Sequence, residues 1–522
     1  MAILEKSGLV DNAAGRMVPE RVNGCDQTPF PGVAKYRPAG SKAAPPVRTA
    51  ADYPENGDKR VPDLETALRK CGLRDGMVIS SHHHLRDGDS VALMALQAAA
   101  RLGVKDLMWF PSASFPSQKS AIELMEAGVI DHIEGSMNGP LGDYCTQGKM
   151  RGMGVLRSHG GRWQAIQDGE VHIDIAVIAA PTADAFGNCD GSHGKSACGS
   201  LGFALADSTY ADHVIAVTDN LVPFPCIPWQ VQGNNVDHVV EVESIGDPAR
   251  IVSGTTQITR SPDRLRIAQF VAQFLRDTGI MRDGFSFQAG AGGIALAFVG
   301  YLKQMMQQAG IKARFVRGGS TKYLVELLEE GLTDYILDGQ TFDLDGVRSL
   351  ANNPRHVATT PFTSYNYHGK GNFASMVDAV VLGATEVDTD FNANVVTHSD
   401  GRLLHGIGGW QNCLAAGCTI LAVPSFRDRI PVIVDEVTTL CGPGELIDVI
   451  VTERGIAINP RRQDLIDAAK GSKLPIRPLE EIKREVERIC GGKPQKPRRG
   501  DRPVAVVKWV DGTLLDSVWQ ID

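Results

Sequence analysis

Two segments of this 522-residue chain resemble each other, and this tandem repeat constrains the fold more than any other feature. The first copy begins CGLRDGMVISSHHHLRDGDS and the second begins TGIMRDGFSFQAGAGGIAL. Arg74-Asp75-Gly76 aligns with Arg282-Asp283-Gly284, and the match resumes where IDIAVIAAPTADAFGN from Ile173 resembles VDAVVLGATEVDTDFN from Val377. We therefore predict two related lobes with the same topology.

Each copy has the pattern of an α/β unit. Helices are expected to begin near Pro62 and at Ser261-Pro262, where serine suits the N-cap and proline the first turn. Gly72 and Gly279 stand where these helices should end. The later apolar runs DIAVIAA, HVIAVT, AVVLGAT, TILAVP and DVIVT are typical of parallel strands covered on both faces. The predicted fold class is α/β, with largely parallel sheets in two pseudo-twofold related lobes.

The chain divides into four predicted parts. Residues 1–60 are rich in proline, glycine and alanine and are expected to form an irregular N-terminal arm. The two repeat copies give domains at 61–250 and 251–480. Residues 481–522 contain a helix, the basic connector KPQKPRRGDRP and a C-terminal β-hairpin with a turn at Asp511-Gly512.

Composition excludes several classes of protein. The net charge is −8 and no long basic run occurs outside the C-terminal part, which argues against a nucleic-acid partner. No stretch reaches the ~18 apolar residues of a membrane span, and the N-terminus lacks the apolar core of a signal peptide, so a cytoplasmic location is expected. None of the 10 cysteines forms a CxxC pair, so neither a metal site nor a disulfide framework is predicted.

The three histidines His82–His84 occupy a position that suits a ligand site. They follow a predicted strand and precede a helix, and in the repeat alignment they lie opposite the glycines of Gly290–Gly293. Ligands of open α/β sheets bind at the carboxyl ends of strands, where glycine turns let backbone amides approach an anion. Three successive residues cannot all point inward, which argues against a metal site. The alternative is a turn in which one histidine packs and the others are solvated.

Two further loops carry candidate anion-binding groups. LRSHGGRW contains Arg157, His159 and Arg162, and arginine forks bind carboxylates in bidentate fashion, so this loop suits a polycarboxylate. NCDGSHGKSACGSLG contains Lys195 among glycines spaced as in an anion-cradling loop. Ordinary surface turns are the alternative for both.

A second glycine-rich loop follows a later predicted strand. VTHSDGRLLHGIGGWQN contains Gly406, Gly408 and Gly409 in a GxGG arrangement that matches GAGG at 290–293. Neither loop has the GxGxxG spacing and following acid of a dinucleotide site, and neither is a P-loop. Each lies just beyond a predicted strand, so we expect both to line a ligand site.

Three segments of the second copy resemble those of CoA-transferases: DGFSFQAGAGG, VVTHSDGRLLHGIGG and DVIVTERGIAINP. The SHHH and SHGGR segments of the first half, together with a length that fuses both halves, resemble the α subunits of citrate lyase. The resemblance covers the chain from about residue 60 to its end. It implies a CoA-transferase-like fold for both lobes.

The resemblance also implies an activity and its partners. Proteins of this family exchange acetate for citrate on the thioester of an acyl-carrier protein, so that acetyl carrier becomes citryl carrier. A β subunit then cleaves the citryl thioester to oxaloacetate and acetyl thioester, and the γ subunit is the carrier. The thiol belongs to a CoA-derived prosthetic group on that carrier, so no intrinsic cofactor is expected for this chain, which is expected to be part of an oligomer.

One departure from the wider CoA-transferase pattern affects the expected mechanism. Typical members use a glutamate nucleophile just past the strand that follows the GxG helix, and here that region reads ARFVRGGSTKYL without an acid. The resemblance therefore implies direct attack of a citrate carboxylate on the acetyl thioester. Glu386 and Asp388 are the remaining candidates for a nucleophile, although a structural role is the favoured interpretation.

The resemblance and the loops together assign roles to candidate site residues. The catalytic group, which is expected to donate hydrogen bonds to the thioester oxygen, is Gly290, Gly292, Gly293 and His83. The citrate-binding group is His82, His84, Arg157, His159, Arg162 and Lys195. The CoA or thioester channel is assigned to Gly318, Gly319, Gly406, Gly408, Gly409, Asn392 and Asn394.

Three alternatives remain open at this point. The acid could be citramalate, which differs from citrate in one carboxymethyl group. The chain could be a classical CoA-transferase or acyl-CoA hydrolase that forms a glutamyl intermediate. It could also be a non-catalytic scaffold that docks other subunits through residues 1–60 and the terminal hairpin.

Overall fold

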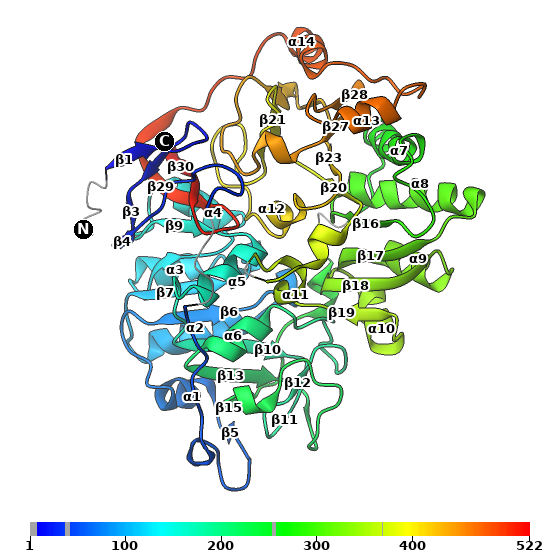
Figure 1. Cartoon of the computed structure of the whole chain (residues 1–522). Helices are drawn as coiled ribbons and strands as arrows, with labels where there is room; N and C mark the ends of the chain where they lie inside the picture. The colour runs from blue at the N-terminus through cyan, green and yellow to red at the C-terminus, as the bar shows by residue number, and fades with distance from the viewer. Residues whose placement is uncertain (1–7, 37–41, 253–256, 368, 522) are drawn as a thin grey trace.

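The protein consists of two α/β lobes, each built on one large sheet (Figure 1). The computed structural model describes residues 8–36, 42–252, 257–367 and 369–521. Figure 1 shows the first sheet in the blue and green part of the ribbon and the second in the green to orange part. Among the described residues, no helix is both long and apolar enough to cross a lipid bilayer.

The first sheet has seven strands, and all its neighbouring strands run parallel. Each residue of β10 is buried, as expected for a strand covered by helices on both faces. The strands in sheet order are β5 (Arg60–Val61), β15 (His238–Glu241), β13 (His213–Thr218), β10 (Ile175–Ala180), β6 (Val78–Ser81), β7 (Leu107–Pro111) and β8 (Ile130–Ile133).

The second sheet has eight strands and is parallel except where β28 pairs with β27. Its order from β18 to β27 repeats the order of the first sheet from β8 to β15. The predicted α/β class, parallel sheets and tandem repeat are therefore confirmed. The strands in sheet order are β19 (His356–Ala358), β18 (Thr333–Thr341), β17 (Ala313–Ser320), β16 (Ser286–Ala289), β20 (Ala379–Leu382), β23 (Thr419–Ala422), β27 (Val449–Thr452) and β28 (Gly455–Ile458).

The repeat extends to individual hydrogen bonds in a small sheet beside each large one. Asn188 donates its backbone N–H to Oδ1 of Asp184 at 3.1 Å and its side-chain amide to Oδ2 at 2.8 Å. Asn392 makes the same two bonds to Asp388, at 3.0 and 3.1 Å. The sheets are β12 (Cys189–Asp190), β11 (Thr182–Asp184) and β14 (Leu221–Val222), and β22 (Ala393–Asn394), β21 (Glu386–Asp388) and β26 (Ile433–Val434).

The helices of the two copies begin and end close to the predicted signals. The Asp63 side chain accepts a hydrogen bond from the Thr66 amide at 2.7 Å and caps the first helix, and proline opens its counterpart. Gly72 and Gly279, at φ of +69° and +72°, end the two helices in the left-handed conformation. The helices of the repeat are α1 (Leu64–Lys70), α2 (Val91–Arg101) and α3 (Ala121–Glu126), and α7 (Pro262–Asp277), α8 (Gly293–Ala309) and α9 (Lys322–Glu329).

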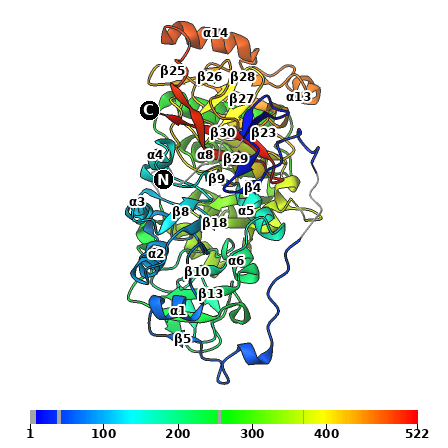
Figure 2. The ribbon, with the colours of Figure 1, turned by 90° about the vertical axis from the view of Figure 1, so that its left-hand side faces the viewer.

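The N-terminal arm and the C-terminal hairpin pack against each other (Figure 2). The arm is not wholly irregular, because it contains two short strand pairs and the Asn12 side chain binds the carbonyl of Leu514 at 3.0 Å. Part of the predicted basic connector is strand, since β29 already begins at Arg499. The strands are β1 (Leu9–Asp11), β2 (Met17–Pro19), β3 (Arg21–Val22), β4 (Cys25–Asp26), β29 (Arg499–Lys508) and β30 (Leu514–Ile521), with β9 (Gly154–Leu156) parallel to β29.

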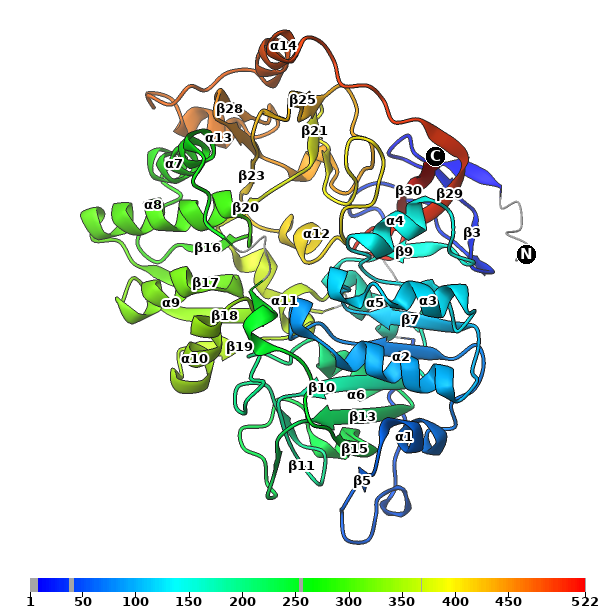
Figure 3. The same cartoon turned by 180° about the vertical axis from the view of Figure 1, so that it is seen from behind.

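Loops of the first lobe contact the carboxyl ends of strands in the second (Figure 3). The imidazole of His83, just after β6, lies 3.0 Å from Oε1 of Gln340 near the end of β18. Gly199 packs so closely on Thr341 that an added Cβ would lie 1.9 Å from its hydroxyl. One hydrophobic cluster contains buried residues from both lobes, the arm and the hairpin, so the lobes share part of their core.

Candidate active site

The histidine turn is anchored by a buried ion-pair network. His82 lies between the carbonyl of Val177, 3.2 Å from its Nδ1, and Asp207, whose Oδ2 lies 3.0 Å from its Nε2. The guanidinium of Arg162 binds both oxygens of Asp207, with Nη2 to Oδ2 at 2.6 Å, and Nη2 also donates to the carbonyl of Phe110 at 3.1 Å. This pairing lowers the pKa of Asp207 despite its burial. Both terminal nitrogens of Arg162 are thus engaged by Asp207, and its citrate-binding role stays a prediction.

His83 connects the two lobes through both ring nitrogens. Its Nδ1 lies 2.6 Å from the Ser112 hydroxyl, and its Nε2 lies 3.0 Å from Oε1 of Gln340, which can only accept. We therefore assign the proton to Nε2 and an accepting role to Nδ1. Burial and the neighbouring His159 lower the pKa of His83 well below its usual value, so the ring is neutral at pH 7. His83 holds the lobes together in this arrangement and has no nitrogen free for substrate.

His84 is buried and has no hydrogen-bond partner in the part of the chain that the structure describes. Its side chain is 1% exposed, and both ring nitrogens are unsatisfied. The ring stacks on His82 with centroids 5.6 Å apart. Burial and His82 lower its pKa well below the usual value, so it too is neutral. The three histidines thus have three different environments, and none of them is solvated.

His159 is half-buried and lies where the first lobe meets the GIGG loop of the second. It opens helix α5 (His159–Gln167), and its backbone N–H donates to the Gly408 carbonyl at 2.9 Å. The next amide, of Gly160, donates to Oδ1 of Asn412 at 3.0 Å. Burial, with Arg162 adding to it, lowers the pKa of His159 to about 3. A neutral imidazole therefore lies beside Gly408.

Several glycines at the carboxyl ends of β16 and β20 have open space beside them, and we call this region the crevice. An added Cβ would meet nothing within 4 Å at Gly292 or Gly383, and only one atom at Gly290 and at Gly408, 3.6 and 3.8 Å away. Trp410 binds the Gly383 carbonyl through its indole N–H at 2.8 Å, which holds the GIGG loop against the end of β20. The two glycine loops predicted from sequence are therefore brought together.

The N-terminus of the 17-residue helix α8 opens at the crevice. No acceptor among the described residues binds the amides of Gly292 and Gly293, so they are available to an anion. Gly290 differs from the prediction, because its amide already donates to the Val381 carbonyl at 3.0 Å and extends the sheet. Position 293 requires glycine, because an added Cβ would lie only 2.7 Å from the carbonyl oxygen of Gln257.

Gly318 and Gly319 lie inside β17 and do not form a turn at a thioester. Gly318 has φ of +113° at a register shift between β17 and β18, a conformation that favours glycine. An added Cβ on Gly319 would lie 1.8 Å from the Phe342 ring. These glycines shape the strand end next to Gln340, and the predicted channel role is not supported by their packing.

Arg317, which the sequence analysis did not select, lies beneath the crevice. Its side chain is fully buried, and Nη1 donates to Oε1 of Gln288 at 2.6 Å. The guanidinium also faces the ring of Tyr365, 4.8 Å from its centroid. A charged residue directly after the run ARFV and directly before two glycines was the available sequence signal. Gln340, Asp207 and Tyr365 had none, because their roles depend on contacts between distant segments.

Arg157 and Lys195 lie outside this group. The buried Arg157 guanidinium pairs with Glu134 at 2.9 Å and with Glu170 at 3.1 Å, and these carboxylates raise its pKa. It links the first lobe to the hairpin, since Lys508 also binds Glu170 at 2.5 Å. Lys195 is exposed and donates to the carbonyl of Glu243 at 2.6 Å. Arg157 is therefore engaged by two carboxylates, and the citrate-binding roles of Arg157 and Lys195 stay predictions.

Asn392 and Asn394 hold the loop after β20 through side-chain hydrogen bonds, and their channel role stays a prediction. Asn392 binds Asp388, as described above, and Asn394 donates to Oε2 of Glu386 at 2.9 Å. Glu386 is 2% exposed and also accepts from the amide and hydroxyl of Thr438, at 2.8 and 3.0 Å. A carboxylate held by three donors is a structural group, which was the favoured interpretation for Glu386.

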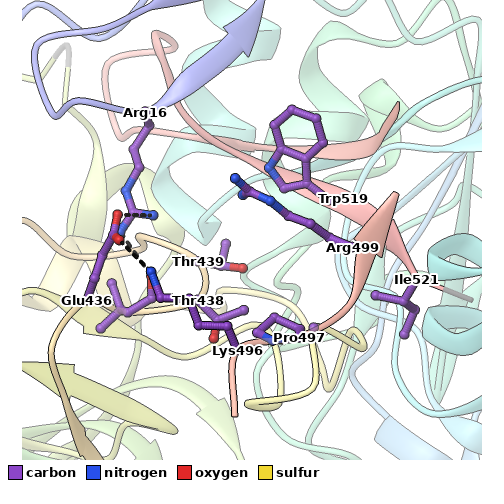
Figure 4. A pocket seen from close by; sticks show the side chains of 11 residues that line it. Arg16, Glu436, Thr438, Thr439, Lys496, Pro497, Arg499, Trp519 and Ile521 are labelled. Carbon is purple, nitrogen blue, oxygen red and sulfur yellow. Dashed lines mark hydrogen bonds and ion pairs between the residues drawn. The ribbon is translucent and has the colours of Figure 1, made fainter. Parts of the chain in front are cut away.

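A second hollow lies between the arm, the hairpin and the loop at 436–439 (Figure 4). It has a volume of about 150 Å³, and in Figure 4 Glu436 lies between Arg16 and Lys496, to which it pairs at 3.4 and 3.6 Å. Arg499 stacks over the Trp519 ring at 4.8 Å. None of the sequence-predicted site residues lines this hollow, so it is distinct from the crevice.

Two lobes of equal topology, with parallel sheets and glycine turns at the carboxyl ends of strands in the second lobe, give this chain a CoA-transferase-type fold. A solved 4-hydroxybutyrate CoA-transferase from Porphyromonas gingivalis has the same fold, with a TM-score of 0.54 at 18% identity over 82% of this chain and 98% of that one. The family model for "Citrate lyase, alpha subunit (CitF)" matches residues 57–521. The chain therefore belongs to the citrate lyase α subunit family.

Individual relatives agree with the family assignment. The citrate lyase alpha chain of Klebsiella pneumoniae is 40% identical over 498 residues, covering 95% of this chain and 96% of its own. A solved structure from Streptococcus mutans, described as an alpha subunit of citrate lyase in complex with citrate, has a TM-score of 0.92 at 39% identity. It covers 98% of this chain and 100% of its own.

Proposed function

We propose that this chain is the transferase of a citrate lyase, exchanging acetate for citrate on the thioester of an acyl carrier. The observation that carries the proposal is the family match over residues 57–521, and relatives with that name match nearly the full length. The crevice adds physical support, because a helix N-terminus with free amides favours a bound anion. Citrate is such an anion at neutral pH.

The proposed reaction proceeds by direct attack. A citrate carboxylate oxygen attacks the acetyl carbonyl carbon, the C–S bond breaks, and a mixed anhydride and the carrier thiolate form. The thiolate then attacks the citryl carbonyl carbon, and acetate leaves. The backbone amides of Gly292 and Gly293 would stabilise the negative oxygen. The contacts of His83 and His159 between the lobes would keep the protein surfaces that bind the two substrates in fixed positions.

Two observations on the described residues favour this route over a glutamyl intermediate. The end of β17 presents Arg317 and two glycines where a classical member would have its glutamate. Glu386 is buried and bound by three donors, which lowers the nucleophilicity of its oxygens. The thiol is supplied by a CoA-derived group on the carrier, so the chain needs no cofactor of its own for these steps.

Citrate lyase β and γ subunits are the proposed partners. The γ carrier would present its thioester to the crevice, and the β subunit would cleave citryl carrier to oxaloacetate and acetyl carrier. Direct exchange by this chain would set it apart from a scaffold, whose role would be to hold the other subunits together.

The exchange can be tested with the purified chain, acetylated carrier and citrate. Mass spectrometry of the carrier is expected to show the acetyl group replaced by citryl, with release of free acetate. Citramalate in place of citrate tests the nature of the acid. The proposal is wrong if the carrier stays acetylated with both acids while the chain is folded.

A further inference from the structure

Arg317 is a fully buried cation without a carboxylate partner in the described part of the chain. Its Nη1 binds the neutral amide of Gln288 at 2.6 Å, whereas Nε and Nη2 have no hydrogen-bond partner. Two other buried arginines are neutralised by carboxylates, Arg157 by Glu134 and Arg162 by Asp207. Buried charges in proteins are normally paired, because an isolated one is costly to desolvate. The positive charge of Arg317 is therefore not compensated by a nearby carboxylate of the described residues.

The surroundings of Arg317 connect it to the crevice. It stands on β17 directly before Gly318, and its neighbour Gln288 on β16 comes two residues before Gly290. Tyr365, in α11 (Pro361–Tyr365), covers the guanidinium with its ring, and its hydroxyl lies 2.9 Å from where a Cβ of Gly409 would stand. Tyr365 thus contacts Arg317 on one side and the GIGG loop on the other.

The electrostatics of this arrangement favour a bound anion. A cation without a nearby acid projects its field through a low-dielectric interior, and the effect is stronger than at the surface. The N-terminus of α8 adds a second positive potential at the same end of the sheet. Burial raises the pKa of Tyr365 to about 12, so its hydroxyl remains a hydrogen-bond donor at neutral pH.

We infer that Arg317 is the buried counter-charge for a carboxylate ligand in the crevice and acts on it through the Tyr365 hydroxyl. Arg317 would be a positioning residue in this role, since it would polarise and orient the Tyr365 hydroxyl, which is the group proposed to bind the ligand. The inference rests on the proposed function for the identity of the acid, which is citrate. It identifies a carboxylate subsite on the second lobe, where the sequence motifs had placed the carboxylate-binding arginines on the first.

The inference makes opposite predictions for stability and for binding. Arg317→Met removes an uncompensated buried charge, so the thermal midpoint of the ligand-free chain should stay the same or rise. The same change should weaken citrate binding about tenfold or more in calorimetry at low ionic strength. Arg317→Lys, which keeps the charge, should retain most of the affinity. The control is Arg314→Met, because Arg314 lies on the same strand but is exposed.

Tyr365→Phe provides a second variant that preserves packing and removes only the hydroxyl. It should weaken citrate binding several-fold without lowering the midpoint. The inference is overturned if Arg317→Met lowers the midpoint and Tyr365→Phe binds citrate as the wild type does. If the wild-type chain binds a different carboxylate in place of citrate, the citrate assignment fails, and the Arg317 effect is then measured with that acid.

Discussion

Asp207 is the residue on which the histidine turn depends most. It neutralises Arg162 and lies within ion-pair distance of His82, and all three side chains are buried. Removing one member of a buried pair leaves the other charge without compensation, which costs far more than the pair contributes as a whole. The arrangement makes a sharp mutational prediction.

Asp207→Asn should lower the free energy of unfolding by about 3–5 kcal/mol, because Arg162 becomes an unpaired buried cation. Adding Arg162→Met should recover part of this loss. Urea unfolding of the two single variants and the double variant measures the coupling between the residues. A loss below about 1 kcal/mol for Asp207→Asn would show that the pair is not as buried as described.

Two glycines should respond in opposite directions to alanine. Gly199 has φ of +90°, and its added Cβ would lie 1.9 Å from the Thr341 hydroxyl oxygen, so Gly199→Ala should destabilise the protein by about 1–3 kcal/mol. Gly300 is inside α8, and an added Cβ there meets nothing within 4 Å, so Gly300→Ala should stabilise by about 0.5–1 kcal/mol. Thermal or urea unfolding measures both variants. A change in stability of the same sign in the two variants would contradict the account.

At the scale of elements, the repeat was readable because both copies retain the same strand and cap signals. The runs DIAVIAA and AVVLGAT became β10 and β20 at equivalent sheet positions, and Gly72 and Gly279 ended equivalent helices. Glycine loops at strand ends were found for the same reason. The carboxylate partners of Arg157 and Arg162 were not predictable, because Glu134 and Asp207 lie 23 and 45 residues from them and only the fold brings them near.

The histidine turn should make the protein acid-labile in a defined window. The pKa values of His83 and His84 are lowered and that of His159 is about 3, so the unfolded chain, with histidine pKa near 6.5, binds more protons below that pH. The free energy of unfolding should therefore fall as the pH drops from about 6.5, by up to about 1.4 kcal/mol per pH unit for each such histidine. Asp89 acts in the opposite direction, because burial raises its pKa to about 7.

The contribution of one imidazole can be isolated with His84→Leu, since His84 makes no side-chain hydrogen bond to the described residues. The difference in unfolding free energy between pH 7.5 and pH 5.5 should be smaller in this variant than in the wild type, with the Asp89 effect common to both. His172→Gln, at an exposed position, is the control. An unchanged pH dependence in His84→Leu would contradict the neutral buried assignment.

At the scale of the whole molecule, the two ends of the chain form one structural unit. Asn12 donates to the carbonyls of Leu514 and Leu515, and the hairpin extends a strand of the first lobe while packing on the second. The sequence predicted the hairpin turn but not this partner, because an arm rich in proline and glycine carries no periodic signal. The hydrogen bond from Asn12 to Leu514 joins residues that are 502 positions apart, so no local sequence pattern could indicate it.

Asn12→Ala should loosen the hairpin without disturbing the crevice. The carbonyls of Leu514 and Leu515 each lose the Asn12 amide as a donor, so amide hydrogen exchange should rise in β29 and β30 and stay unchanged in β16 and β17. Hydrogen-exchange mass spectrometry measures this difference directly. Asn352→Ala, on an exposed helix surface, serves as the control. Uniformly raised exchange would show instead that the arm supports the whole fold.

The central claim is that citrate attacks the thioester directly in the crevice, with no acyl group on the protein. A single turnover with citrate labelled with ¹⁸O in its carboxylates tests this most directly, because the attacking oxygen must leave with acetate. Mass spectrometry is expected to find one ¹⁸O in the released acetate and none in the protein. Unlabelled acetate with ¹⁸O in a glutamate of the chain would contradict the account and establish a glutamyl intermediate.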